Sequence, residues 1–213
     1  MTVYREAKTI YFREGGAQAT EATLMAAIDR AMELNLGHLV VASSTGRTGL
    51  RAVKLAQAKG YKGKVAVVAQ HYGYDRPDEQ KMPERVQKQL EAQGARVFIG
   101  THALSSVARS FRLRWQGIEM AEVIAEALRR ISRGIKVCFE VTVMAADAGL
   151  IPTTRDVVAV AGSGGGADSA IVVRPANMNN FLNMKVREVI AMPQLAEDEV
   201  EREKKRSGKR KKK

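Results

Sequence analysis

Two turns that lie far apart in the sequence contain the groups that a bound phosphate requires. The first turn follows a short apolar run, HLVVA, and leads into a segment with helical periodicity. It gathers four hydroxyl side chains, a glycine and an arginine, namely Ser43, Ser44, Thr45, Gly46, Arg47 and Thr48. Backbone N–H groups at a helix start have no partner inside the helix, and together with the helix dipole they favour an anion. Because a single cap needs one hydroxyl and not four, phosphate binding is preferred over simple helix capping.

The second turn is rich in glycine and lies between two apolar runs that predict strands. In the sequence AGSGGGADSAIVV its residues are Gly162, Ser163, Gly164, Gly165, Gly166 and Asp168. Nearly bare backbone of this kind can surround an anion with N–H groups, and Asp168 is a candidate for orienting ligand hydroxyls. A flexible hairpin turn explains the glycines equally well when the segment is considered alone.

Other candidate ligand contacts lie at the expected carboxyl ends of neighbouring strands. Thr101 and His102 follow the apolar run RVFIG and are candidates for contacting a ring carbonyl; His102 is also a weak candidate for proton transfer. Tyr72 and Tyr74 follow the run KVAVVAQ and are candidates for covering an aromatic ring. In open parallel α/β sheets, ligands collect beyond the carboxyl ends of the strands, so these segments predict one common site.

The remaining titratable side chains have simpler explanations. Glu140 lies in an otherwise apolar segment, and a pair with Lys136 one helical turn earlier is preferred over a direct role with a ligand. Cys138 in the same segment is interpreted as a small core residue. The three histidines and the scattered carboxylates show no metal-ligand spacing, so no metal site is predicted.

Alternating strand and helix periods must position these candidates. The sequence predicts strands at 38–43, 64–70, 96–100, 155–162, 169–175 and 185–193, the last at an edge of the sheet, and helices that begin near residues 20, 47, 78, 119 and 135. This order predicts an α/β fold with three layers, α/β/α, and a mostly parallel sheet. Residues 1–195 are expected to form a single α/β domain, and residues 196–213 a disordered basic tail.

Positive charge is concentrated at the end of the chain. The 213 residues have a formal net charge of +12, and +7 of it comes from the nine basic and two acidic residues of EREKKRSGKRKKK. Weak, nonspecific contact with RNA is one interpretation of such a run, although it lacks the aromatic residues on which bases stack. A solubilising disordered end explains the run equally well. The single cysteine excludes a disulfide framework, and no apolar run is long enough for a membrane span, so a cytoplasmic location is expected.

Several longer motifs resemble those of a known family. A stand-alone family related to the C-terminal α/β domain of pyruvate kinase has similar motifs, which appear here as YFREGGAQATEATL, VVASSTGRTGL, GTHALS, GIKVCFEVTVMAADAGLIP and GSGGGADSAIVV. The resemblance implies that the first turn holds a phosphate, that Gly162 to Gly166 lie against the same ligand, and that this ligand is flavin mononucleotide (FMN). The Trp-Arg element before the glycine-rich loop of pyruvate kinases is missing, which weighs against a sugar bisphosphate. No pyruvate kinase activity is expected, because the catalytic barrel is absent.

Three classes of function remain open on this basis. The chain is a binding or regulatory module for a phosphorylated small molecule, with FMN preferred and a sugar-phosphate effector as the alternative. The second class is a flavin-dependent oxidoreductase, and the third is a protein that associates with nucleic acid through its tail. A homo-oligomer is the usual expectation for a soluble protein of this size.

Overall fold

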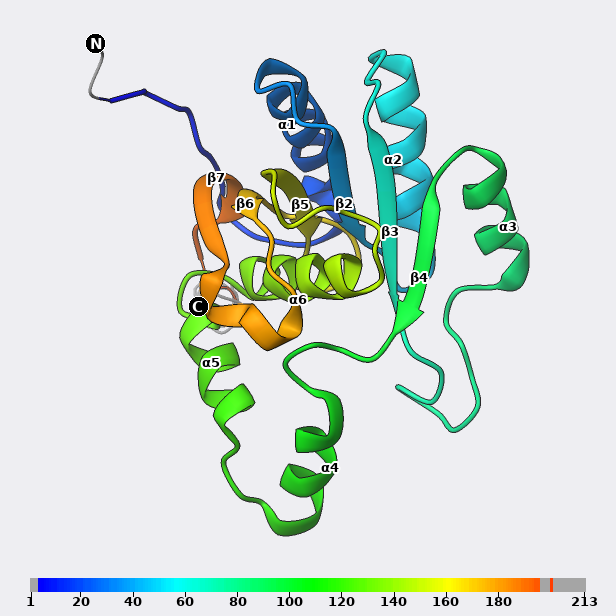
Figure 1. Ribbon diagram of the computed structural model, residues 1–213, viewed down its shortest axis with the longest axis vertical. Helices are drawn as coiled ribbons and strands as arrows, with labels where there is room; N and C mark the ends of the chain where they lie inside the picture. Colours follow the sequence, from blue (N-terminus) through cyan, green and yellow to red (C-terminus); the bar gives the residue numbers. More distant parts are fainter. Residues whose placement is uncertain (1–3, 196–199, 201–213) are drawn as a thin grey trace, which may run out of the picture.

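The computed structural model describes residues 4–195 and 200, and it contains one seven-stranded sheet with helices on both faces (Figure 1). The strand order is β1-β7-β6-β5-β2-β3-β4. The strands are β1 (Ile10–Phe12), β2 (His38–Ala42), β3 (Lys64–Gln70), β4 (Arg96–Gly100), β5 (Val157–Ala161), β6 (Ser169–Arg174) and β7 (Lys185–Pro193). β6 runs antiparallel to both of its neighbours, and every other neighbouring pair is parallel.

The helices divide between the two faces of the sheet. Those on one face are α1 (Thr20–Glu33), α2 (Arg47–Ala58) and α3 (Glu84–Ala92). The opposite face is covered by α6 (Arg133–Asp147), which follows α4 (Ser106–Trp115) and α5 (Met120–Arg129) in the chain. Two short 3-10 segments, η1 (Ala17–Ala19) and η2 (Met178–Asn183), complete the described elements. The predicted three-layer α/β fold is confirmed.

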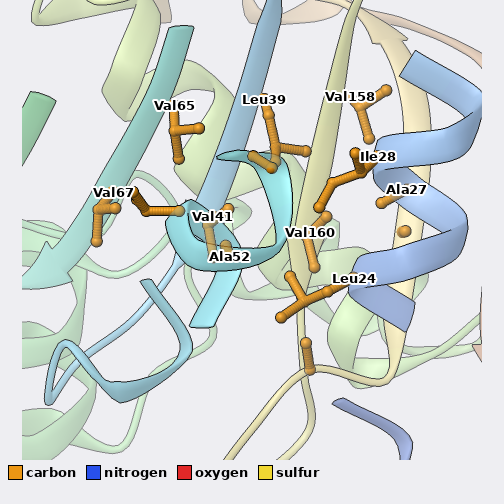
Figure 2. Packing of buried hydrophobic residues seen from close by; sticks show 14 of the residues in the cluster. Leu24, Ala27, Ile28, Leu39, Val41, Ala52, Val65, Val67, Val158 and Val160 are labelled. Atoms are coloured by element: carbon orange, nitrogen blue, oxygen red, sulfur yellow. The ribbon is translucent and has the colours of Figure 1, made fainter. Parts of the chain in front are cut away.

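Alternate residues of the strands fill two apolar cores. Leu39 and Val41 of β2 pack in one core with Leu24 and Ile28 of α1 (Figure 2). Val40, which lies between them in the strand, belongs to the second core under α6. Successive side chains of a strand point to opposite faces, and here both faces are covered. This explains why the central strands are unbroken apolar runs in the sequence.

Cys138 lies in the second core and is fully buried. Its Sγ–H group points at the carbonyl oxygen of Ala159, with an S–O distance of 3.5 Å. Burial raises the pKa of this thiol well above its usual range, and the nearby charge of Asp168 acts in the same direction. The prediction that Cys138 is a small core residue is confirmed.

The predicted edge position of residues 185–193 is wrong. β7 lies between β6 and β1, so the short strand Ile10–Phe12 forms that edge of the sheet. Ile10 pairs with Ala191 and Phe12 with Pro193, across almost the whole length of the chain. A strand of three residues contains too little alternation to be recognised from its own sequence, because its pairing is set by a distant partner.

The helix predicted to begin at Pro77-Asp78 begins only at Glu84. Asp78 has a φ of +60°, a left-handed conformation that a right-handed helix cannot include. Residues 71–83 therefore form an irregular loop, and Pro83 in an extended conformation provides the N-cap of α3. α4 (Ser106–Trp115) was also not predicted from the sequence, although Val107, Phe111 and Trp115 have helical spacing.

The basic tail predicted for residues 196–213 lies outside the described residues, apart from Val200. Its disorder and its contact with RNA stay predictions. Among the helices of the described chain, none combines the length and the apolar character needed to cross a bilayer.

Candidate functional site

The two glycine-containing turns line one cavity of about 920 Å³ at the carboxyl edge of the sheet. β2 and β5 are adjacent and parallel, with Val41 opposite Val160, so the turns that follow these strands emerge side by side. The cavity is lined by most of the predicted site residues, namely Ser43, Ser44, Thr45, Arg47, Thr48, His102, Gly162, Ser163, Gly164, Gly165 and Gly166. Gly46, Thr101 and Asp168 do not line it.

The first turn uses one hydroxyl for its own structure. Ser43 is buried, and its Oγ accepts a hydrogen bond of 3.1 Å from the N–H of Gly49, which caps α2. Within the described chain the hydroxyls of Ser44 and Thr48 have no hydrogen-bond partner, and Thr45 Oγ1 accepts only a long contact of 3.4 Å from Arg47 Nε. The backbone N–H groups of Ser44, Thr45, Arg47 and Thr48 also have no acceptor among the described residues. Three hydroxyls and four N–H donors therefore remain for a ligand.

Gly46 shapes this turn without lining the cavity. It has a φ of +81° at the N-cap of α2, a conformation that glycine adopts without steric cost. A Cβ at this position would lie 2.3 Å from Cγ1 of Val86 in α3. Gly46 thus allows the tight strand-to-helix connection, and its contact with a ligand stays a prediction.

Asp168 fixes the second turn through hydrogen bonds inside the protein. It is fully buried, and its Oδ2 accepts hydrogen bonds from Gly16 N at 2.9 Å and from Ser163 N and Oγ at 3.1 and 2.5 Å. Its Oδ1 accepts a further bond of 2.9 Å from Ser169 Oγ. Both oxygens are engaged inside the protein and Asp168 does not line the cavity, so its contact with ligand hydroxyls stays a prediction. Asp168 instead fixes the glycine-rich loop against the segment that precedes α1.

The glycine-rich loop presents bare backbone to the cavity. The N–H groups of Gly164, Gly165 and Gly166 have no acceptor within the described chain, whereas the next residue, Ala167, donates to Thr20 Oγ1 at 3.0 Å. Hydrogen bonds to Asp168 and Thr20 thus fix both ends of the loop, and the N–H groups between them are available to an anion.

We expect Gly166→Ala to lower the free energy of unfolding by about 1–3 kcal/mol. Gly166 has a φ of +126°, and a Cβ would lie 2.4 Å from Thr20 Oγ1 and 2.8 Å from Ala17 Cα. Gly164→Ala is the matched control, since nothing lies within 4 Å of its added Cβ. Urea unfolding measures both variants, and equal stabilities would contradict this account of the loop.

One wall of the cavity is formed by α6 and contains a buried ion pair. Lys136 Nζ lies 2.5 Å from Glu140 Oε2, and the two side chains are 10% and 2% exposed. Glu140 Oε1 also accepts a hydrogen bond of 3.2 Å from the N–H of Leu104. The predicted pair is confirmed, and it lies beside the apolar side chains of Val137 and Met144, which line the same wall.

Aromatic rings form another part of the rim. The rings of Tyr74 and His102 both line the cavity, with centroids 4.9 Å apart and planes tilted by 34°. The guanidinium group of Arg109 in α4 lies 5.3 Å from the centroid of Tyr74. Tyr72 and Thr101 are exposed and do not line the cavity, so the candidate contacts in these two segments narrow to Tyr74 and His102.

The stability of the protein is expected to fall as the pH drops below about 6.5. Burial lowers the pKa of His102; the negative charge of Glu140 opposes this effect, and nearby cations add to it. Burial also lowers the pKa of His38. The unfolded chain therefore takes up protons before the native chain does. Stability is complete above the ordinary histidine pKa and is lost as the pH falls through the lower native values.

Urea unfolding across this pH range, with His102→Gln as the comparison, measures the effect. The variant should keep only the part of the loss that belongs to His38. Superimposable pH profiles of the two proteins would show that His102 does not contribute.

Several residues that line the cavity were not predicted from the sequence. Arg51 lines the cavity and pairs with Glu21 of α1. Its spacing of one helical turn after Arg47 was the signal that placed it on the same side of α2. Thr20 and Lys81 also line the cavity, but they come from the start of α1 and from the 71–83 loop, and no local pattern connects them with the two turns.

These features define a three-layer α/β protein with a cavity of mixed polar and apolar lining at the carboxyl edge of its sheet. The family model for the pyruvate kinase, alpha/beta domain matches residues 21–173. The match runs from α1 into β6 and includes both turns that line the cavity. Because it covers more than half of the chain, the chain belongs to the pyruvate kinase alpha/beta domain family.

Proposed function

We propose that the chain binds a phosphorylated small molecule in this cavity and that FMN is the best candidate. The observation that carries the proposal is the meeting of two turns on one cavity, each with donors that no described protein group uses. Free hydroxyls come from the start of α2, free backbone N–H groups come from both turns, and Arg47 adds positive charge, whereas Arg51 is paired with Glu21. Helix starts, glycine-rich nests and arginines are the usual partners of phosphate groups.

The rest of the cavity favours a ligand with a flat apolar part. The side chains of Val68, Val137, Val141 and Met144 line it together with the ring of Tyr74. Ligand sites of this type combine apolar walls with a few polar groups that set orientation. An aromatic ring attached to a phosphate fits this division better than a fully polar sugar does. A flavin bound here would supply electron or hydride transfer.

A sugar bisphosphate is the alternative, and it requires a second cationic group facing the cavity. Lys136 is close to Glu140 and is neutralised by it. Lys81 lines the cavity but pairs with Asp75 at 2.5 Å. Both of these cations are thus already compensated, which favours a ligand with a single phosphate.

Titration of the purified chain with FMN, riboflavin and fructose 1,6-bisphosphate tests the proposal. FMN should bind at least about a hundredfold more tightly than riboflavin, because only FMN presents a phosphate to the two turns. Mass spectrometry of molecules that co-purify with the chain provides an independent check. Equal affinity for FMN and riboflavin, or binding of the sugar bisphosphate alone, would contradict the FMN assignment. Bleaching of a bound flavin by NADH or NADPH would add redox activity.

Thr48→Val is expected to weaken FMN binding by about tenfold to a hundredfold while leaving the fold intact. The substitution preserves the shape of the side chain and removes a hydroxyl that has no partner in the described chain. A hydrogen bond to a charged group is worth about 1.5–3 kcal/mol. Fluorescence titration measures the change, and riboflavin serves as the control ligand because its affinity should not depend on Thr48. An unchanged affinity for FMN would remove Thr48 from the phosphate site.

A further inference from the structure

Helices α4 and α5 form an arm that projects from the body of the protein (Figure 1). The arm is defined here as residues 106–131. Apart from Ser106, whose side chain is not described, no side chain of α4 is buried. The arm exposes a set of large apolar side chains, namely Val107, Phe111, Leu113, Trp115, Ile118, Met120, Val123 and Ile131.

These side chains form stripes along the two helices. On α4, Val107, Phe111 and Trp115 are spaced at four-residue intervals, and the rings of Phe111 and Trp115 lie 4.9 Å apart. On α5, Met120 and Val123 share one face by the same helical geometry. Ile118, between the helices, is 82% exposed. Many exposed large apolar side chains on two consecutive helices are typical of an interaction site.

Basic and acidic residues are separated along the arm, so that two copies of it can present opposite charges to each other. α4 contains three arginines and no acidic residue, whereas α5 begins with Glu119 at its N-cap and Glu122 in its first turn. Arg112 and Glu122 already pair within the arm at 3.6 Å. Arg114 and Glu119 have no charged partner in the described chain. A second copy of the chain, related by a twofold axis, would place its acidic residues opposite these arginines and its arginines opposite these acidic residues.

We propose that a second copy of this chain packs on the arm, so that two arms form an isologous interface. In this arrangement Arg114 of each copy faces the region of Glu119 on the other, and the apolar stripes meet between them. The eight exposed apolar side chains of the arm supply the apolar centre that such an interface needs. An anionic bilayer fits less well, because acidic residues follow the apolar tip directly on α5.

Sedimentation equilibrium of the full chain tests the proposal. The protein should be a dimer, and Phe111→Glu with Trp115→Glu should weaken the association by at least about a hundredfold. Met32→Glu is the matched control, since Met32 on α1 is 43% exposed and Phe111 is 45% exposed. Circular dichroism checks that each variant is folded. A monomeric wild-type chain, or an arm variant that associates as strongly as the wild type, would overturn the proposal.

Charge reversal distinguishes arm-to-arm packing from other uses of the arm. Arg114→Glu and Glu119→Arg should each weaken the dimer, because each places like charges together. A mixture of these two variants should dimerise again, since every contact then joins opposite charges. A mixture that stays monomeric would overturn the proposed arrangement. A wild-type monomer that co-sediments with phosphatidylglycerol vesicles would assign the arm to a membrane surface and overturn the proposal as well.

Discussion

Replacing Gly164 with aspartate should abolish measurable FMN binding without unfolding the protein. Gly164 lines the cavity in the middle of the glycine-rich loop, and nothing lies within 4 Å of a Cβ built at this position. The new carboxylate would stand where the loop is proposed to meet the phosphate. Two unit charges 4 Å apart repel by about 4 kcal/mol at an effective dielectric constant of 20, which corresponds to roughly a thousandfold loss of affinity.

Gly164→Ala is the matched control for this experiment, because it adds the same Cβ without the charge. Its affinity for FMN should stay within a few-fold of the wild-type value, and both variants should unfold at the same urea concentration. An aspartate variant that binds FMN normally would place the phosphate elsewhere. An alanine variant that loses binding as well would show that the backbone of the loop, and not its charge, limits the site.

Replacing Glu140 with leucine should lower the free energy of unfolding by about 3–5 kcal/mol. The substitution removes the carboxylate that neutralises Lys136, whose side chain is only 10% exposed. It also removes the acceptor of the Leu104 N–H group, at the point where the chain enters the arm. A buried charge without a partner and a buried donor without an acceptor both destabilise the native state.

The double variant Lys136→Met with Glu140→Leu provides the control in a double-mutant cycle. Removing both charges should restore much of the stability, so the two single effects should not add. Urea unfolding of the four proteins gives the coupling energy. Simple additivity would show that the two side chains do not stabilise each other, despite their short contact.

The central part of the fold could be predicted from the sequence because local patterns determine it. The strands at 64–70 and 96–100 were predicted with the bounds that the structure gives, since each is an apolar run between polar turns. β1 could not be predicted, because its three residues acquire their conformation from pairing with β7. The start of α3 was misplaced, because the left-handed conformation of Asp78 leaves no sign in the periodicity.

The candidate site divides in the same way. Hydroxyls and glycines that follow a predicted strand directly were recognisable, and the sheet brings both turns to one cavity. The orientation of Asp168 was not recognisable, because its partners include Gly16, which is distant in the sequence. Thr20 and Lys81 enter the cavity from segments that only the tertiary structure brings close.

The burial of Cys138 makes the chain a convenient background for attaching spectroscopic probes. It is the only cysteine, it is fully buried, and its raised pKa keeps it as an unreactive thiol at neutral pH. A cysteine introduced at an exposed position would therefore be the single site that reacts with a maleimide dye or a nitroxide label. Distances across the cavity or between two copies of the chain become measurable without first removing a native thiol.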